Sequence, residues 1–162
     1  MVWTSDVAGL VNGDVRVSAQ RFVRPAGGHV PTPPSSLGAI PFARLEGRAE
    51  FALALADDEA IWLGLTGPVG ALRATAETVA GERVNVHGAR ISCGLTILVG
   101  LTADNDGFPT LDLSRVLGLR LLGAGDVVDI ALMSRAAFAR VGGAPLPKPL
   151  DPGLGYRGYR LP

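Results

Sequence analysis

The amino-acid sequence predicts an all-β fold, a mainly antiparallel sandwich or barrel with one or two short helices and extended terminal arms. Three observations support this prediction. Apolar residues recur at every second position in several stretches, which is the period of a half-buried strand. Turn-forming residues separate these stretches at short intervals. The chain has 162 residues, 48% of them hydrophobic, so it is long enough to bury one sizeable core.

Four regions follow from the composition along the chain. The first contains the stretch 15–23, in which Val15, Val17 and Ala19 alternate with polar residues and predict a strand. The second is rich in proline, glycine and serine, which is typical of an extended connector that crosses a surface or separates the strand from the body. The regions are an N-terminal strand or arm at 1–24, a connector at 25–41, a β-rich globular domain at 42–143 and a C-terminal arm at 144–162.

The β-rich domain is predicted to begin with one strand over 44–55, in which apolar residues alternate with Arg and Glu. The acidic residues Asp57, Asp58 and Glu59 are expected to form a hairpin tip that faces water. The next strand carries Trp62 out of step with its apolar neighbours, which is typical of a core or interface aromatic and also fits a ligand platform. Further strands are expected at 72–79, 83–87, 90–101 and 127–132, and helices near 112–118 and over 135–141, the latter capped by Ser134.

A predicted hairpin decides whether Cys93 and His87 form a thiolate–imidazole pair. The dipeptide Gly88-Ala89 fits a two-residue type II′ turn. This turn pairs Val84 with Cys93 on an apolar face and directs His87 to the opposite face, so we expect a buried, inert thiol. The polar face is either an ordinary solvated sheet face or a small-ligand site. The candidate ligand-binding residues are Arg83, Asn85, His87 and Arg90, together with Trp62.

Composition excludes several classes of function. The 15 basic and 15 acidic residues cancel, so no global field attracts nucleic acid or anionic lipid. A single cysteine excludes an internal disulfide and a cysteine-based zinc site. The apolar run 91–101 is too short to span a membrane, and the start of the chain lacks the pattern of a signal peptide. We expect a cytoplasmic protein without a membrane, a metal or a cofactor.

Two short motifs match known patterns only in part. Residues 153–158 spell G-x-G-x-x-G, but prolines precede them and no strand or helix flanks them as a dinucleotide site requires. Asp104 begins the sequence DNDG, which is found inside calcium-binding loops, yet Thr102 and Leu113 occupy positions where carboxylates are needed. We expect a simple turn at Asp104, with a weak surface calcium site as the alternative.

Residues 111–132 resemble the unit of AbrB-like swapped-hairpin barrels in which a short helix, an LG turn and a GD dipeptide precede a strand. The matching sequences are LGL at 117–119 and GD at 125–126. The resemblance implies a small barrel that is often dimeric and, in some members, binds DNA. The zero net charge argues against the DNA-related role.

The C-terminal arm is the strongest indication of function. Prolines stiffen its first half, and residues 155–160 repeat the triplet GYR. Tyr and Arg are enriched at the centres of protein interfaces, so we expect the arm to pack on its own body or on a neighbouring subunit. A proline-rich ligand, a weak nucleic-acid contact and a disordered tail are the alternatives. The candidate partner-binding residues are Tyr156, Arg157, Tyr159 and Arg160.

The sequence therefore favours a non-enzymatic binding or assembly protein, as a homo-oligomer or with another protein partner, and nucleic acid is not the expected partner. No catalytic residue is assigned. The alternative from another class is a small β-barrel enzyme or small-molecule binder. Such a protein would use a pocket near Trp62 or His87 with a carboxylate such as Asp104 or Asp129.

Overall fold

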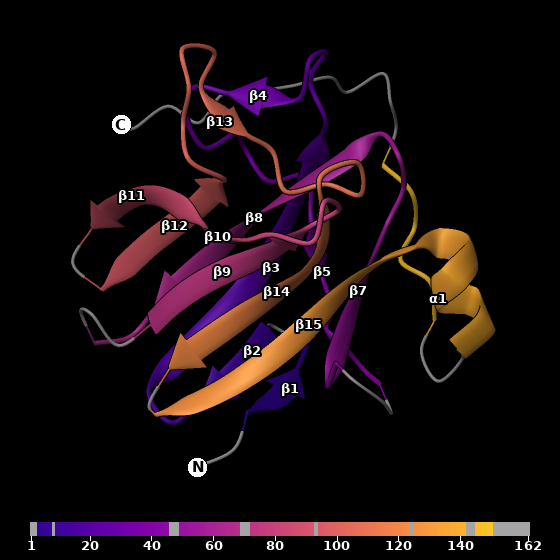
Figure 1. Ribbon diagram of the computed structural model, residues 1–162. Coiled ribbons are helices and arrows are strands. Elements are labelled where there is room, and N and C mark those ends of the chain that lie inside the picture. Colours follow the sequence, from indigo (N-terminus) through magenta and orange to yellow (C-terminus); the bar gives the residue numbers. More distant parts are fainter. Residues whose placement is uncertain are drawn as a thin grey trace.

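The computed structural model describes seven segments of the chain and forms two β-sheets packed face to face (Figure 1). This arrangement confirms the predicted all-β sandwich, and within the described residues neither sheet closes into a barrel. Side chains are described throughout these segments except at 90–92. The described segments are 3–7, 9–45, 49–68, 72–92, 94–123, 125–141 and 145–150.

The first sheet is antiparallel, and β3 and β8 form its centre through eight paired residues on each strand. The segment 15–23, expected in an N-terminal strand or arm, is therefore an interior strand between β2 and β8. A short strand, β5 (Ala39–Ile40), also pairs with β3. In spatial order the sheet contains β1 (Thr4–Asp6), β2 (Gly9–Asn12), β3 (Val15–Val23), β8 (Glu59–Thr66), β12 (Leu95–Gly100) and β11 (His87–Ser92).

The second sheet covers the first and contains one parallel pair, β15 with β7. Beside this pair packs the single described helix, α1 (Arg135–Val141), whose Phe138 is buried against Ala52 and Ala54. A small ribbon of β4 (His29–Val30) and β13 (Phe108–Pro109) lies at one end of the sandwich, at the top of Figure 1. The sheet order is β10 (Arg83–Asn85), β9 (Leu72–Thr78), β14 (Val116–Gly123), β15 (Asp126–Ser134), β7 (Phe51–Leu55) and β6 (Ala43–Arg44).

The core lies between the sheets and follows the period-two patterns of the sequence. Val15, Val17 and Ala19 are buried, as their alternation predicts, and Leu119 and Leu121 face them from the second sheet as members of the same cluster. The prediction of a helix over 135–141 is also confirmed, because Ser134 Oγ accepts a hydrogen bond from the Ala137 N–H at 3.1 Å.

The predicted turn at Gly88-Ala89 is wrong. The chain instead passes from β10 in the second sheet to β11 in the first, and β11 pairs with β12 around Gly94. Gly88 lies at a register shift within this pair, where an added Cβ would lie 1.7 Å from the Ile97 carbonyl oxygen. This glycine therefore permits a close approach of two backbones rather than a turn. Cys93 lies outside the described residues.

Three other local predictions are corrected. The single strand expected over 44–55 is two antiparallel strands, β6 and β7. The helix expected near 112–118 is absent, because turns lead directly into β14, which also contains the LGL of the AbrB-like pattern. The residues after β7 do not form a hairpin tip, since β7 and β8 belong to different sheets. Glu59 is consequently buried rather than exposed to water.

Candidate functional site

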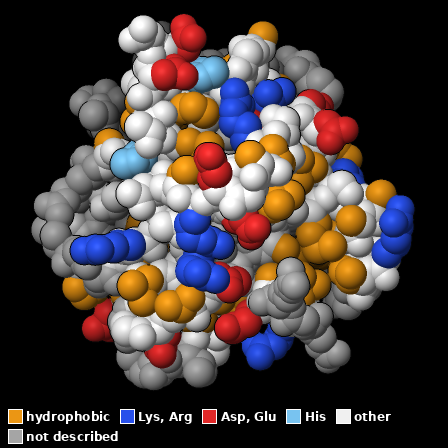
Figure 2. All heavy atoms as spheres, viewed as in Figure 1, with side chains coloured by type: hydrophobic (Ala, Val, Ile, Leu, Met, Phe, Trp, Pro, Cys, Tyr) orange, Lys and Arg blue, Asp and Glu red, His pale blue; other side chains and the backbone are white. Residues whose placement is uncertain are grey.

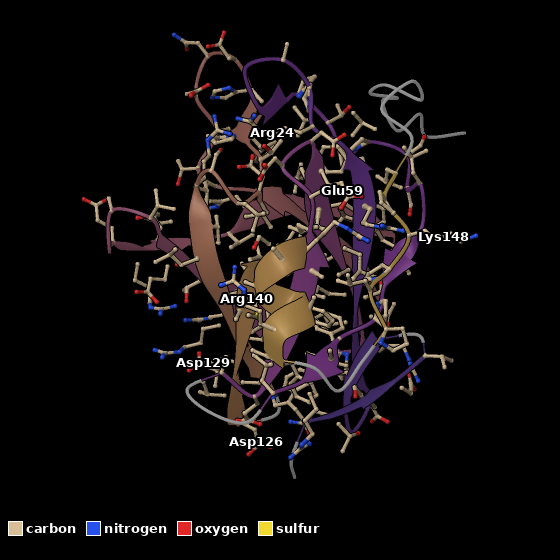
Figure 3. All side chains as sticks on the ribbon, turned by 90° about the vertical axis from the view of Figure 1, so that its right-hand side faces the viewer. Arg24, Glu59, Asp126, Asp129, Arg140 and Lys148 are labelled. Carbon is tan, nitrogen blue, oxygen red and sulfur yellow. The ribbon has the colours of Figure 1, made fainter. Side chains whose placement is uncertain are left out.

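The main candidate site is where the C-terminal arm meets the body. Tyr156, Arg157, Tyr159 and Arg160, the predicted partner-binding residues, lie outside the described residues. The described part of the arm, 145–150, runs along the body of its own chain beside α1 and the first sheet. Figure 3 shows the Lys148 side chain in this segment extending outward from the molecule. The proline-rich half of the arm is thus a strap on its own body, which was one of the two arrangements expected from the sequence.

A buried ion pair lies beneath this strap. Glu59 is fully buried and Arg21 is only 8% exposed, with 3.3 Å between Arg21 Nη1 and Glu59 Oε2. Glu59 Oε1 also accepts a hydrogen bond from the Ala56 N–H at 2.8 Å, which fixes the carboxylate in the arch between β7 and β8. A buried charge is tolerated only when it is paired and hydrogen-bonded.

The same two charged groups bind the main chain of the strap. Arg21 Nη1 donates to the Lys148 carbonyl oxygen at 2.6 Å. The Leu150 N–H donates to Glu59 Oε2 at 2.9 Å, and the Leu150 side chain is only 8% exposed. Arg135, the first residue of α1, donates to the Pro147 carbonyl oxygen. We call Arg21, Glu59 and Arg135 the arm receptor.

The sequence contains a signal for this receptor in the phase of two charged residues. Arg21 follows Val15, Val17 and Ala19 in the same phase of β3, so it falls on the face that enters the core. Glu59 is in phase with Ile61 in β8 in the same way. A charged residue at an apolar position of each of two strands is a reason to look for a buried pair. The pairing of β3 with β8, which brings the two together, is a long-range contact that no local pattern predicts.

An apolar cavity of about 290 Å³ lies between the first half of the strap and the body. Side chains of the strap and of the body line this space together, and it is partly open to solvent. The receptor bonds begin at Pro147, the last of the three strap residues that line the cavity, and continue to Lys148 and Leu150. The cavity is lined by Pro41, Phe42, Ala43, Ala54, Phe138, Pro145, Leu146 and Pro147.

The predicted ligand-binding residues on β10 and β11 are brought together only in part. Asn85 and His87 line one shallow hollow of about 330 Å³ with Arg73. Arg83 lies instead by a hollow of about 450 Å³ on the outer face of the second sheet. Its Nη1 donates to Thr75 Oγ1 at 3.1 Å. The side chain of Arg90 is not described.

Trp62 is part of a small apolar cluster rather than of the His87 hollow. Its side chain is half-buried and packs with Phe22 and Val30 on the outer side of the first sheet. The indole N–H donates to the Pro34 carbonyl oxygen at 2.9 Å, so the ring holds the proline-rich connector against β8. This environment supports the structural interpretation of Trp62.

The two carboxylates suggested for an enzyme are in ion pairs. Asp129 Oδ1 accepts from Arg120 Nε at 2.7 Å on the open face of the second sheet. Asp104 Oδ2 lies 3.0 Å from His29 Nε2. A hydrogen bond from the Asp106 N–H, followed by the hydrogen bond and charge of His29, lowers the pKa of Asp104. Asp104 and Gly107 form the turn that the sequence predicted.

Asp112 is a second buried carboxylate that the sequence did not indicate. Its Oδ2 lies 2.9 Å from Arg24 Nε and 3.2 Å from Arg115 Nη1, and both Thr110 and Ser114 donate hydroxyl hydrogen bonds to the carboxylate. Burial alone would raise the pKa of Asp112, but the hydrogen bonds from Ser114 and Thr110 and the charge of Arg24 lower it below its usual value. These bonds join the connector to the segment before β14, so the cluster is structural.

Comparisons with descriptions of protein families, with curated proteins and with solved structures found no match. Among the residues that the structure describes, no group of three or more His, Cys, Asp and Glu side chains is placed to hold a metal ion. Within the same segments, no helix is both long and apolar enough to cross a membrane. The function proposed below therefore rests on the geometry of the arm and its receptor.

Proposed function

We propose that this protein is a non-enzymatic binding and assembly protein whose C-terminal arm contacts a neighbouring subunit. The observation that carries this proposal is the use of a buried ion pair to hold the main chain of the strap. Removing two charges from water costs free energy. Because this buried pair also makes hydrogen bonds to the main chain of the strap, it gives the arm a defined position.

The fixed position of Leu150 matters for the residues that follow it. Tyr156 is six and Arg160 ten residues beyond Leu150 in the sequence, which corresponds to a reach of up to about 20 to 35 Å in an extended chain. Contacts made by these residues to a second molecule start from an anchored point, so less conformational entropy is lost on binding. Tyr and Arg supply the buried area and directed hydrogen bonds that such contacts need.

The body also exposes apolar side chains that a second subunit can cover. Leu122 and Val127 are directly paired across β14 and β15 and are 43% and 50% exposed. Leu117, on the same strand as Leu122, is also exposed. Figure 2, which views the outer face of the second sheet, shows hydrophobic side chains among charged ones on this face. A mixed surface of this kind is typical of non-obligate protein contacts.

The test compares molecular mass by light scattering for the full chain and for a chain ending at Leu150, which keeps the strap. We expect the full chain to have a multiple of the 16.7 kDa mass and the shortened chain to be a monomer of unchanged thermal stability. The variant Tyr156→Ala/Tyr159→Ala should behave like the shortened chain. Asp151→Ala, between the strap and the GYR repeat, is the matched control and should keep the full mass. Equal masses for full and shortened chains would refute the proposed contact.

A second candidate function is supported by the hollow at Asn85 and His87, which brings two of the predicted ligand-binding residues together. Both side chains are exposed and offer hydrogen bonds to a small polar molecule. The test is a fragment screen followed by backbone amide NMR. A ligand of this site should shift the amides of 85–87 and lose binding in His87→Ala. Hits that shift only residues elsewhere would rule out this function.

A further inference from the structure

The arm receptor recognises main-chain groups, not side chains. Its three bonds go to the carbonyl oxygens of Pro147 and Lys148 and to the N–H of Leu150. All three involve a charged side chain, and such hydrogen bonds are roughly twice as strong as neutral ones. An extended segment fits the receptor if it presents two successive carbonyls and then an N–H two residues after the second carbonyl.

The sequence requirement of the receptor is confined to a few positions. The Leu150 side chain is buried, whereas Lys148 is exposed, so only the last position is selected by side-chain packing. Pro147 and Pro149 have no N–H to satisfy and favour the extended polyproline conformation before binding. The receptor thus fits a Pro-x-Pro-Leu peptide, a common type of protein-recognition segment.

The strap is held at one end and loosely packed at the other. The cavity of about 290 Å³ lies beside Pro145, Leu146 and Pro147. Leu146 is 38% exposed although it borders this cavity. Little apolar packing would be lost if this half of the strap left the body, so the charged bonds at Pro147, Lys148 and Leu150 and the buried Leu150 side chain supply most of the attachment. A segment attached in this way resembles a bound peptide more than a strand of the fold.

We propose that the arm receptor is an exchangeable peptide-binding site whose second occupant is segment 145–150 of another copy of this chain. The proposal rests on the proposed function, because contacts of the residues after Leu150 hold two copies together and exchange then passes the strap between copies that are already associated. The same segment from a second copy makes the same bonds, so exchange replaces each contact with an identical one. Gly142 and Gly143, between α1 and the strap, supply a sequence suited to a change of chain direction.

The experiment uses full-length chains with a protease site inserted between Gly143 and Ala144. Unlabelled and ¹⁵N-labelled chains are mixed, incubated and then cut in the cold, and native mass spectrometry measures which strap each body carries. A second sample is cut before mixing and reports any exchange of the cut strap itself. We expect unlabelled bodies that carry labelled straps to be more abundant in the sample mixed as intact chains than in the sample cut before mixing.

Variants of the receptor make the test specific. Arg135→Ala removes one charged hydrogen bond to the strap and should lower the equilibrium constant for binding of the cut strap about tenfold. Arg140→Ala, in the last turn of the same helix, is the matched control and should retain the strap like the unmodified protein. Circular dichroism of the cut protein checks that the body remains folded.

Three results would overturn the proposal. Absence of labelled straps from unlabelled bodies in the sample mixed as intact chains would show that intact chains do not exchange straps. Loss of the strap from both kinds of body on cutting would show that the receptor does not hold it as a peptide. Unfolding on cutting would show that the strap is part of the fold. Each outcome is distinguishable from failure of the proposed function, because that test removes residues after Leu150 whereas this one follows 145–150.

Discussion

The ion pairs Arg21–Glu59 and Arg120–Asp129 have the same chemistry in opposite surroundings. The exposed pair has the shorter contact, 2.7 Å between Arg120 Nε and Asp129 Oδ1 against 3.3 Å in the buried pair. Its side chains are 44% and 37% exposed, whereas those of Arg21 and Glu59 are 10% and 0% exposed. Figure 3 shows Asp129 on the opposite side of the view from Lys148 and the strap.

Surroundings, and not distance, therefore decide what an ion pair does in this protein. Water screens the exposed pair and hydrates either partner when the other is removed. In the buried pair each partner is the main neutralising group of the other, and both also bind the strap. Removing one partner there leaves an uncompensated charge and an unsatisfied arm.

The largest predicted effect is that of Glu59→Gln. The substitution keeps the shape of the side chain but leaves the buried Arg21 guanidinium without a counter-charge. We expect the free energy of unfolding to fall by about 3 to 5 kcal/mol. Urea denaturation followed by tryptophan fluorescence measures this change. Gln20→Glu, at a half-buried position next to Arg21 on β3, is a control that should change stability far less.

A double substitution tests whether the Arg21–Glu59 pair stabilises the fold by itself or mainly by binding the arm. Replacing a buried ion pair by apolar residues of similar size is often neutral or stabilising. Here Arg21→Met/Glu59→Leu should remain less stable than the unmodified chain, because the Lys148 carbonyl and the Leu150 N–H lose their partners. A double variant as stable as the unmodified chain, with its strap still in place, would show that the receptor bonds contribute nothing to holding the arm.

An intermediate effect is predicted at Asp112, whose pKa is lowered in the folded protein from the usual 3.8. A carboxyl with a lowered folded-state pKa contributes stability that is complete above the unfolded-state pKa and is lost as pH falls toward the folded-state pKa. The free energy of unfolding should therefore decline as pH drops below about 4, and Asp112→Asn should make that decline shallower. Denaturation midpoints between pH 2 and 7 in the two proteins measure the difference. Identical slopes would contradict the role of this cluster.

The smallest effect is predicted for Asp129→Asn, which removes the exposed pair. Solvent already screens this interaction, and Asn can still accept a hydrogen bond from Arg120. The urea midpoint should stay within the error of the measurement, and added salt should change it equally in both proteins. A loss comparable to that of Glu59→Gln would show that the comparison between the two pairs is wrong.

Local patterns in the sequence were sufficient to predict the fold class, because alternation in β3 and β15 follows from burial of one sheet face. They were also sufficient for α1, where Ser134 caps the first turn. They failed at Gly88, since a close approach between two strands and a tight turn both require glycine. A turn and a bulge can be distinguished only when the partner strand is known.

The candidate site was predicted less well than the fold. The sequence indicated that the arm packs on its own body or on a neighbouring subunit. In the structure, residues 145–150 of the arm lie on the body of their own chain. The receptor itself was missed because Asp57, Asp58 and Glu59 form one acidic run in the sequence but separate in space at the change of sheet. Which neighbouring residue of such a run is buried depends on the pairing of β8 with β3, and that pairing is a property of the whole sandwich.

Hydrogen exchange at the Leu150 amide, measured by NMR on the full chain, tests whether Arg21 and Glu59 hold the arm. We expect strong protection, because this N–H donates to a buried carboxylate. In Arg135→Ala this protection should be lost before any change in the amides of β3 and β8. Exchange of the Leu150 amide at the rate of an unstructured peptide in the unmodified protein would contradict the claim that Arg21 and Glu59 hold the arm.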